Sequence, residues 1–238
     1  MSKFKKLLII PAFNEAKSLL ALIEEVKEKA PDYDYIIIND GSTDNTEEIC
    51  RINNLNALNL PINLGIGGAM QTGYLYAHKK GYDIAVQLDG DGQHDPEDLK
   101  SLTEPIENGT ADMTIGSRFM NNEGFKSSLP RRIGILLLSM LIYILTGKRY
   151  LDVTSGLRAV NKKVISLFSR LYPEDYPETE SLMMLIMLKQ NIQECSVIMR
   201  ERIAGKSSIY FIQAVYFMIK VTISIIVTKL RSEKDIKI

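Results

Sequence analysis

Short apolar runs alternate with helical patterns through the first 130 residues, and this alternation restricts the fold more than any other feature of the chain. Each run is closed by Gly, Pro, Asn or Asp, which is typical of a buried strand. The runs are residues 7–10, 35–38, 84–88 and 113–115, with a further one at 57–60. The helical patterns between them are residues 16–30, the stretch after Ser42-Thr43-Asp44, residues 67–80, and the stretch from Pro96 with Asp95 as N-cap. Strands that alternate with helices predict an α/β fold with a mostly parallel sheet and helices on both faces.

In such a sheet, ligands bind at the carboxyl ends of the strands, so the residues after each run are the candidates for function. Asp89 and Asp91 follow the run at 84–88, in the segment DGDGQH. Two carboxylates one residue apart on a glycine-rich turn can direct oxygens to one point, as Mg²⁺ or Mn²⁺ requires. The alternative is an ordinary Asp-Gly turn. An EF-hand loop is a poor match, because its twelfth position, counted from Asp89, is Lys100.

Two further strand ends carry carboxylates. Asp40 follows the run at 35–38, and Glu15 lies shortly after the first run. Either side chain can accept a hydrogen bond from a base or a ribose, although Asp40 can equally serve a turn before a helix. The segment GIGGA at residues 65–69 is similar to a phosphate-binding loop but is not a strict GxGxxG motif. Close packing of a helix start against the nucleotide region is therefore the favoured explanation of these glycines.

The first of two long apolar segments is residues 133–145, which contains no charged residue. It lies between Arg131-Arg132 and Lys148-Arg149. A helix of this length extends about 20 Å, which is too short for a hydrocarbon core of about 30 Å. The segment is therefore either a buried core helix or a helix in the membrane interface with its arginines at the headgroups.

The second apolar segment, residues 208–228, is interrupted by Gln213 and Lys220. A lysine at the centre of a span costs about 2.5–3.5 kcal/mol on insertion into a membrane. The pattern therefore favours an interfacial or partner-packed helix over a span. The following Lys229-Leu230-Arg231 adds positive charge where anionic headgroups would lie.

Composition narrows the classes of function. The 29 Lys and Arg residues balance the 29 Asp and Glu residues, whereas nucleic-acid-binding proteins normally have a basic surplus. Cys50 and Cys195 lie far apart, which excludes a disulfide scaffold and a cysteine-based zinc site. Two histidines leave little room for a histidine-rich metal site. The apolar stretch in residues 1–15 is too short for a signal peptide, so we expect a cytosolic orientation.

The polar motifs form an ordered series over roughly residues 7–208: PAFNE (11–15), NDGS (39–42), NLG (63–65), DGDGQH (89–94), GSR (116–118), DVTSGLR (152–158) and RIAGKSS (202–208). This series resembles that of the family 2 glycosyltransferases, which have the Rossmann-like GT-A fold. Within the family, the chain is most similar to the branch of dolichyl-phosphate mannose synthases and polyprenyl-phosphate glycosyltransferases. The later motifs are those of that branch.

The resemblance implies roles for individual residues. The substrate-binding residues on the nucleotide side would be Pro11, Phe13, Glu15, Asp40 and Gly68. The ligands of Mg²⁺ or Mn²⁺ on the donor diphosphate would be Asp89, Asp91 and Gln93. The side chains that face the phosphates of donor and acceptor would be Arg118, Arg131 and Arg202, and Asp152 would orient the acceptor. The residues implied to be catalytic are Asp91, Arg118 and Asp152.

The implied activity is transfer of a sugar, with inversion, from a UDP- or GDP-sugar to undecaprenyl or dolichyl phosphate, in the synthesis of cell-envelope polysaccharide or glycans. A phosphate acceptor has a second pKa of about 6, so it is already ionised and needs no strong general base. Two alternatives are transfer by the same fold to a saccharide or protein hydroxyl, and a catalytically silent scaffold that binds a membrane partner.

We expect the chain to consist of a catalytic domain, residues 1–206, and a C-terminal apolar helix with a basic tail, residues 207–238. The catalytic domain would include an interface helix at 131–147. We expect a peripheral or monotopic protein at the cytoplasmic face of the cell membrane. Its exposed apolar helices predict a small membrane-protein partner or a homo-oligomer, and no nucleic acid is expected as a partner.

Overall fold

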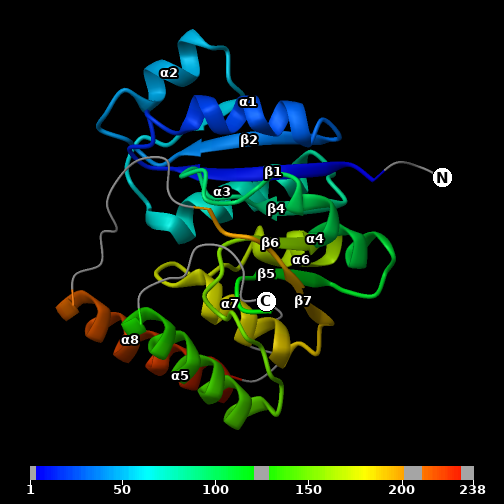
Figure 1. The fold of residues 1–238 in the computed structure, drawn as a ribbon, viewed down its shortest axis with the longest axis vertical. Coiled ribbons are helices and arrows are strands. Elements are labelled where there is room, and N and C mark those ends of the chain that lie inside the picture. Colours follow the sequence, from blue (N-terminus) through cyan, green and yellow to red (C-terminus); the bar gives the residue numbers. More distant parts are fainter. Residues whose placement is uncertain (1–3, 121–128, 201–210, 232–238) are drawn as a thin grey trace.

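The computed structural model describes residues 4–120, 129–200 and 211–231. Its centre is a seven-stranded sheet in the order β3-β2-β1-β4-β6-β5-β7 (Figure 1). The strands are β1 (Lys6–Ala12), β2 (Tyr33–Asn39), β3 (Ala57–Asn59), β4 (Ile84–Gln87), β5 (Met113–Ser117), β6 (Arg158–Asn161) and β7 (Ile192–Ser196). β6 lies between β4 and β5 and runs antiparallel to both, whereas the other neighbours are parallel. The predicted α/β fold with a mostly parallel sheet is confirmed.

Helices cover both faces of the sheet, as the sequence predicts. They are α1 (Leu19–Lys29), α2 (Thr46–Ile52), α3 (Gly65–Lys79), α4 (Asp98–Glu107), α5 (Leu129–Thr146), α6 (Lys162–Phe168), α7 (Pro177–Met187) and α8 (Phe211–Leu230). α4 begins at Asp98 and not at Pro96, and Asp95 accepts a hydrogen bond from the Glu97 N–H of the turn before it (3.0 Å).

Alternate residues of β1 point into two separate cores. Leu7 and Ile9 pack with α3, α6 and α7 on one face of the sheet, and Leu8 and Ile10 pack with α1 and α4 on the other. All four side chains are fully buried. A strand that is buried on both faces needs apolar residues at every position, which is why its sequence shows a continuous run without alternation.

α5 is longer than the thirteen-residue apolar run that marks it in the sequence, because it spans 18 residues. By length and composition it is long enough to cross a membrane, and it alone is so among the described helices. The prediction that this segment is too short to span is therefore wrong. Only one side of α5 is in the core: Leu138 and Ile142 are buried, whereas Leu136 and Ile144 are about two-thirds exposed.

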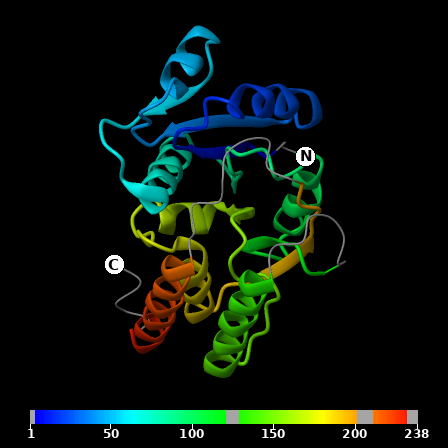
Figure 2. The same cartoon turned by 60° about the vertical axis from the view of Figure 1, so that its left-hand side comes forward.

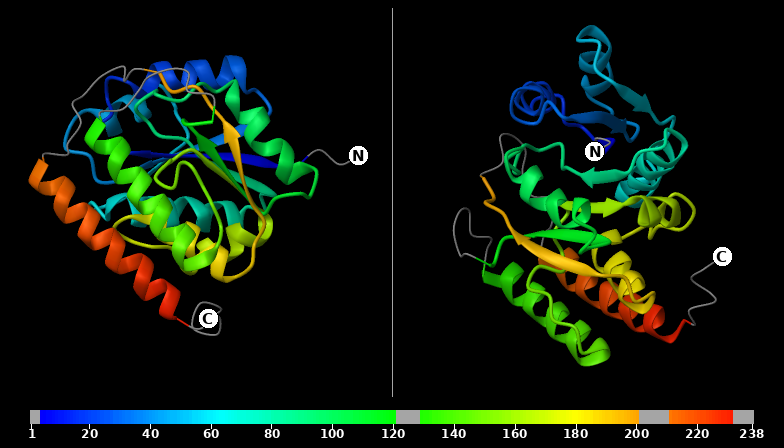
Figure 3. Two further views of the ribbon diagram at one scale, coloured as in Figure 1. Left: turned by 60° about the horizontal axis from the view of Figure 1, so that its bottom comes forward. Right: turned by 90° about the vertical axis from the view of Figure 1, so that its right-hand side faces the viewer.

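α8 lies beside α5 and packs against α7 (Figures 2 and 3). Its Val221 and Ile225 are buried in the same core as α3 and α6. Lys220, the charge that interrupts the apolar segment, forms an ion pair with Asp175 (2.5 Å) and lies over the ring of Tyr176. α8 is thus packed on the domain. Both helices begin on the side of the molecule where β1 and β2 end (Figures 1 and 3).

Candidate active site

The carboxyl ends of β1, β2 and β4 meet at one edge, because the three strands are parallel and adjacent. The Ser18 hydroxyl joins two of the segments that follow, since it donates either to a Glu15 carboxylate oxygen (2.7 Å) or to the Gly90 carbonyl (2.9 Å). Gly90 also lies against Pro11, whose carbonyl oxygen would be 3.1 Å from a Cβ at residue 90. The structure therefore brings Pro11, Glu15 and the acidic motif together.

Asp40 lies at the end of β2 and is buried. One of its carboxylate oxygens accepts the Leu64 N–H (2.7 Å), so this side chain holds the turn that leads into α3. Phe13, in the loop after β1, is about half exposed and presents its ring at the surface of the same edge. Asn14, which the sequence analysis missed, has a φ of 59° and accepts the Thr43 N–H (2.8 Å). A left-handed Asn in a loop is the local signal that could have identified it.

The acidic motif after β4 holds its side chains in different environments. The Asp89 side chain is about one-third exposed, and Asp91 is buried. Asp91 Oδ1 accepts the Gln93 N–H (3.1 Å). Gln93 donates an Nε2–H to the Arg200 carbonyl (3.3 Å), which leaves its Oε1 available to a ligand. Burial opposes ionisation of Asp89, but its interactions with His94 (Nε2–Oδ2 3.8 Å), Gln87 and Arg118 outweigh this effect and lower the pKa of Asp89.

This donor set fits Mg²⁺ or Mn²⁺. It offers carboxylate and amide oxygens, and the low pKa keeps Asp89 in the anionic form that a metal requires. Within residues 4–120, 129–200 and 211–231, the structure has no group of three or more His, Cys, Asp or Glu side chains that could enclose a metal. A cation here would therefore complete its coordination with substrate phosphates and water, as magnesium commonly does.

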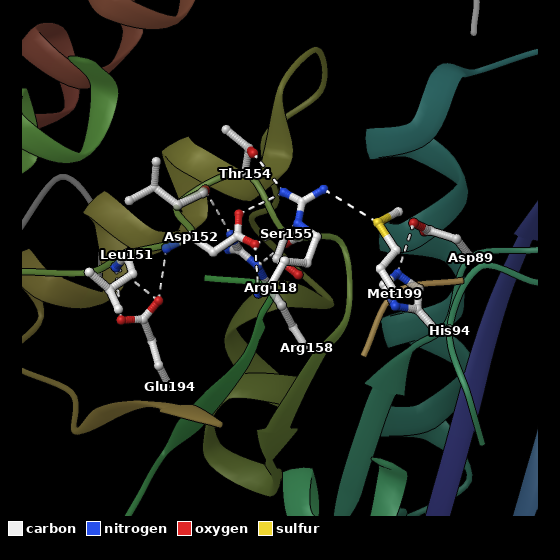
Figure 4. Close-up of polar contacts among 11 residues, drawn as sticks. Asp89, His94, Arg118, Leu151, Asp152, Thr154, Ser155, Arg158, Glu194 and Met199 are labelled. Atoms are coloured by element: carbon white, nitrogen blue, oxygen red, sulfur yellow. Dashed lines mark hydrogen bonds and ion pairs between the residues drawn. The ribbon is translucent and has the colours of Figure 1, made fainter. Parts of the chain in front are cut away.

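Arg118 and Asp152 form a buried pair beside the acidic motif (Figure 4). Arg118 donates Nε to Asp152 Oδ2 (2.6 Å) and Nη2 to Asp152 Oδ1 (2.7 Å), and its backbone N–H also reaches Oδ2 (3.1 Å). Burial opposes the charge on Arg118, but the bond to Asp152 outweighs it and raises the pKa of Arg118. Two parallel N–H···O bonds fix the orientation of the guanidinium as well as its position.

The other predicted residues lie apart from this pair. Gly68 is in the first turn of α3, where a Cβ would lie 2.5 Å from the Cβ of Leu64. Gly67 is the tightly packed member of that segment, because a Cβ there would lie 2.2 Å from the Glu174 carbonyl oxygen. The helix start is closely packed at Gly67, but the contact is with residues 173–174, and packing of this segment against the nucleotide region stays a prediction. Arg131 is exposed in the first turn of α5, and Arg202 lies outside the described residues.

Glu194 on β7 is a further residue that was not predicted; its carboxylate accepts the Leu151 and Asp152 N–H groups. Arg158 stands in the motif DVTSGLR but was given no role. It is buried at the start of β6, and its guanidinium donates to the Ser155 carbonyl (2.8 Å). Glu194 carries no sequence signal that could have identified it.

Comparison with known proteins agrees with this arrangement. The family model for glycosyl transferase family 2 matches residues 7–168. A UDP-N-acetylglucosamine–dolichyl-phosphate N-acetylglucosaminyltransferase of Methanococcus voltae is 36% identical over 203 residues, which cover 78% of this chain and 80% of the relative. The undecaprenyl-phosphate mannosyltransferase of Micrococcus luteus is 31% identical over 160 residues, which cover 64% of this chain and 65% of the relative.

Among solved structures, glucosyl-3-phosphoglycerate synthase from Mycobacterium tuberculosis, in complex with Mn²⁺, UDP and phosphoglyceric acid, superposes with a TM-score of 0.72. The match covers 96% of this chain and 79% of the other, at 19% sequence identity, and shows the shared fold. The ordered strand-end motifs, the sheet topology and the match over two-thirds of the length lead to one assignment: this chain belongs to glycosyl transferase family 2.

Proposed function

We propose that the protein transfers a sugar, with inversion, from a nucleotide sugar to a polyprenyl phosphate at a membrane surface. One observation carries this proposal: a cation-competent acidic motif and a buried, oriented arginine lie on the side of the molecule where two helices with exposed apolar faces begin. The relatives named for dolichyl-phosphate and undecaprenyl-phosphate transfer support the choice of acceptor. A UDP- or GDP-sugar is the proposed donor.

On the donor side, the residues that would bind the nucleotide sugar are Pro11, Phe13, Glu15, Asp40 and Gly68. Asp89, Asp91 and Gln93 would hold Mg²⁺ or Mn²⁺, which would stabilise the negative charge of the departing nucleoside diphosphate as a Lewis acid. Arg118 supplies a second positive charge, preorganised by its bond to Asp152.

On the acceptor side, a phosphate oxygen of the lipid attacks the anomeric carbon while the bond from that carbon to the diphosphate oxygen breaks. The attacking oxygen is already anionic, so the chain needs no strong base at this position. Arg131, in the first turn of α5, would attract the headgroup. Arg202, which lies outside the described residues, is proposed for the same role. Asp152 is fully buried and its two oxygens hold Arg118, so it would orient the acceptor through that arginine.

The acceptor's polyprenyl tail needs an apolar surface next to the site. The side of α5 that faces away from the core supplies one, and its exposed residues are Leu129, Ile133, Leu136, Leu137, Met140, Tyr143 and Ile144. α8, which lies beside α5, exposes further apolar residues: Tyr216, Ile219, Ile223, Ile226, Val227 and Leu230. We assign residues 1–206 to catalysis and 207–238 to attachment, with the protein peripheral or monotopic at the cytoplasmic face. A small membrane protein or a second copy of this chain would cover the apolar residues of α5 and α8 that the lipid does not contact.

The proposal is tested by incubating the purified protein with UDP- and GDP-sugars, Mg²⁺ or Mn²⁺ and a short polyprenyl phosphate, with the product identified by mass. We expect a sugar–phosphate–polyprenyl product from the wild type. We expect a loss of at least about 100-fold for Asp91→Ala, because the carboxylate that the metal needs is removed. The melting temperature should remain near that of the wild type. A product formed only on a soluble saccharide would contradict the proposed acceptor. If calorimetry detects no binding of any nucleotide sugar, the proposed enzymatic activity is contradicted.

A further inference from the structure

Residues 151–156 form a loop that connects the two parts of the candidate site, and this loop is called the bracing loop below. Asp152 in this loop holds Arg118 through three hydrogen bonds. At its other end, Gly156 lies against the acidic motif, since a Cβ at that residue would be 2.8 Å from Asp89 Oδ2. The positions of Asp89 and Arg118 therefore both depend on the path of one short piece of backbone.

The first side chain that sets this path is Glu194, which comes from β7. Its Oε1 accepts the N–H of Leu151 (2.9 Å) and of Asp152 (2.8 Å), and its Oε2 also accepts the N–H of Leu151 (2.8 Å). The carboxylate thus binds the two amides at the start of the bracing loop (Figure 4). Hydrogen bonds from N–H groups to an ionised carboxylate are shorter and stronger than those between neutral groups.

The second side chain is Arg158, the first residue of β6, which is 2% exposed. Its guanidinium donates to the carbonyl oxygens of Val153 (3.0 Å) and Ser155 (2.8 Å), and also to the carbonyl of Glu178 in α7. Arg158 also donates to the Ser181 hydroxyl (3.2 Å), so within the described residues its partners are three backbone carbonyls and one hydroxyl. A planar group with five donors can hold several carbonyls at once, which lysine cannot do.

The two side chains bind complementary groups of the bracing loop: Glu194 accepts hydrogen bonds from N–H groups of the loop, and Arg158 donates hydrogen bonds to its carbonyl oxygens. Neither residue lies where a substrate atom would be, because Arg158 is buried and the Glu194 oxygens are occupied by backbone. On the basis of the proposed function, we infer that Glu194 and Arg158 are positioning residues for sugar transfer. They act by keeping Asp152 in place to orient Arg118, and Gly156 in place beside Asp89.

The inference is tested first with Glu194→Ala, Glu194→Gln and a matched control, Gln193→Ala. Gln193 is the neighbouring residue on β7, and its side chain makes one bond to the backbone carbonyl of Thr110 (3.0 Å), away from the loop. At a temperature where all variants are folded, we expect Glu194→Ala to lower kcat about 100-fold with the donor KM within about twofold of wild type, because only the alignment of the reacting groups is lost. Glu194→Gln keeps an acceptor oxygen and should restore most of kcat. Gln193→Ala should behave as wild type.

A second measurement does not depend on activity. The Arg118 N–H is bound by Asp152, so its hydrogen–deuterium exchange reports on the bracing loop. We expect faster exchange at Arg118 in Glu194→Ala and in Arg158→Lys, and no change in Gln193→Ala. Unchanged exchange together with wild-type kcat in Glu194→Ala would overturn the inference, and so would equal losses in Gln193→Ala. A wild type that transfers no sugar would contradict the proposed function instead, while the exchange result would still decide whether Glu194 positions Arg118.

Discussion

At the scale of single residues, Gly156 is important because it has no side chain. Its backbone is not left-handed, so conformational freedom does not explain the glycine. The space that a Cβ would take is occupied by Asp89 Oδ2 at 2.8 Å and by Gln87 Nε2 at 3.2 Å. The absence of a side chain therefore lets the bracing loop approach a carboxylate that would hold the metal.

Gly156→Ala should weaken Mn²⁺ binding about tenfold, or about 1.4 kcal/mol, because the new methyl group displaces the Asp89 carboxylate. Titration calorimetry with Mn²⁺, in the presence of UDP and separately of GDP, measures this effect without relying on turnover. Ser155→Ala is the control, because the buried Ser155 hydroxyl has no hydrogen-bond partner in the described structure. Wild-type affinity in Gly156→Ala would show that Asp89 does not hold the metal in this position.

At the scale of elements, α8 has two faces with opposite surroundings. Ile225 is fully buried in the core against α7, whereas Ile223, two residues earlier, is 56% exposed. Ser224 lies between them and donates to a carboxylate oxygen of Glu180 in α7 (2.5 Å). The helix therefore stabilises the domain with one face and leaves the other face, which is proposed for attachment, exposed to solvent.

The two isoleucines of α8 give a matched pair of substitutions. Ile225→Asp should lower the free energy of unfolding by at least about 3 kcal/mol, because it buries a carboxylate without a partner. Ile223→Asp should change it by less than about 0.5 kcal/mol but weaken binding to vesicles that contain anionic lipid. Urea unfolding and vesicle sedimentation measure the two effects. Vesicle binding by Ile223→Asp at the wild-type level would show that this face does not contact lipid.

At the scale of the whole molecule, a charge network joins segments that are far apart in the sequence. Arg200, after β7, forms ion pairs with Glu25 in α1 (2.7 Å) and with Asp95 before α4. Lys29 also reaches Glu25 (3.0 Å) and Asp95 (3.2 Å). Because the Arg200 N–H is bonded to the Gln93 carbonyl (2.8 Å), this network also supports the turn that carries the predicted metal ligands.

The network predicts a dependence of stability on pH. Burial opposes ionisation of Glu25, but bonds from Arg200 and Lys29 outweigh it and lower the pKa of Glu25 below its ordinary value of 4.5. A lowered pKa means that the unfolded state binds the proton more readily, so the contribution of Glu25 is complete above pH 4.5 and is lost as pH falls through the folded-state value. The groups are partly exposed, so this contribution is about 0.5–1 kcal/mol.

Glu25→Gln should therefore lower stability near pH 7 by about that amount and flatten the loss of stability below pH 4.5. Urea unfolding at a series of pH values measures both. Glu24→Gln, an exposed neighbour on the same helix, should have little effect. A variant with the wild-type acid dependence would show that Glu25 does not contribute through its charge.

Much of the site could be predicted from local sequence, because turn chemistry is local. The acidic motif and Asp40 each follow a strand by only a few residues, so the end of the strand predicts their location. The length of α5 could not be read from apolar residues alone. Its first turn includes Pro130 and the two arginines, which are compatible with a helix start but contribute no apolar signal.

The sequence by itself determined the strands β1 to β5, the helices α1 to α5 and α8, and the carboxylates at the strand ends, since each depends on residues within one turn or one run; β6, β7, α6 and α7 were not predicted. Only the tertiary structure decided that β6 lies between β4 and β5, which sets Arg118 against Asp152, 34 residues away, and places Glu194 beneath the same loop. The reason is that strand order depends on how the helices pack over the whole sheet, and no pattern in a single segment of the chain encodes it.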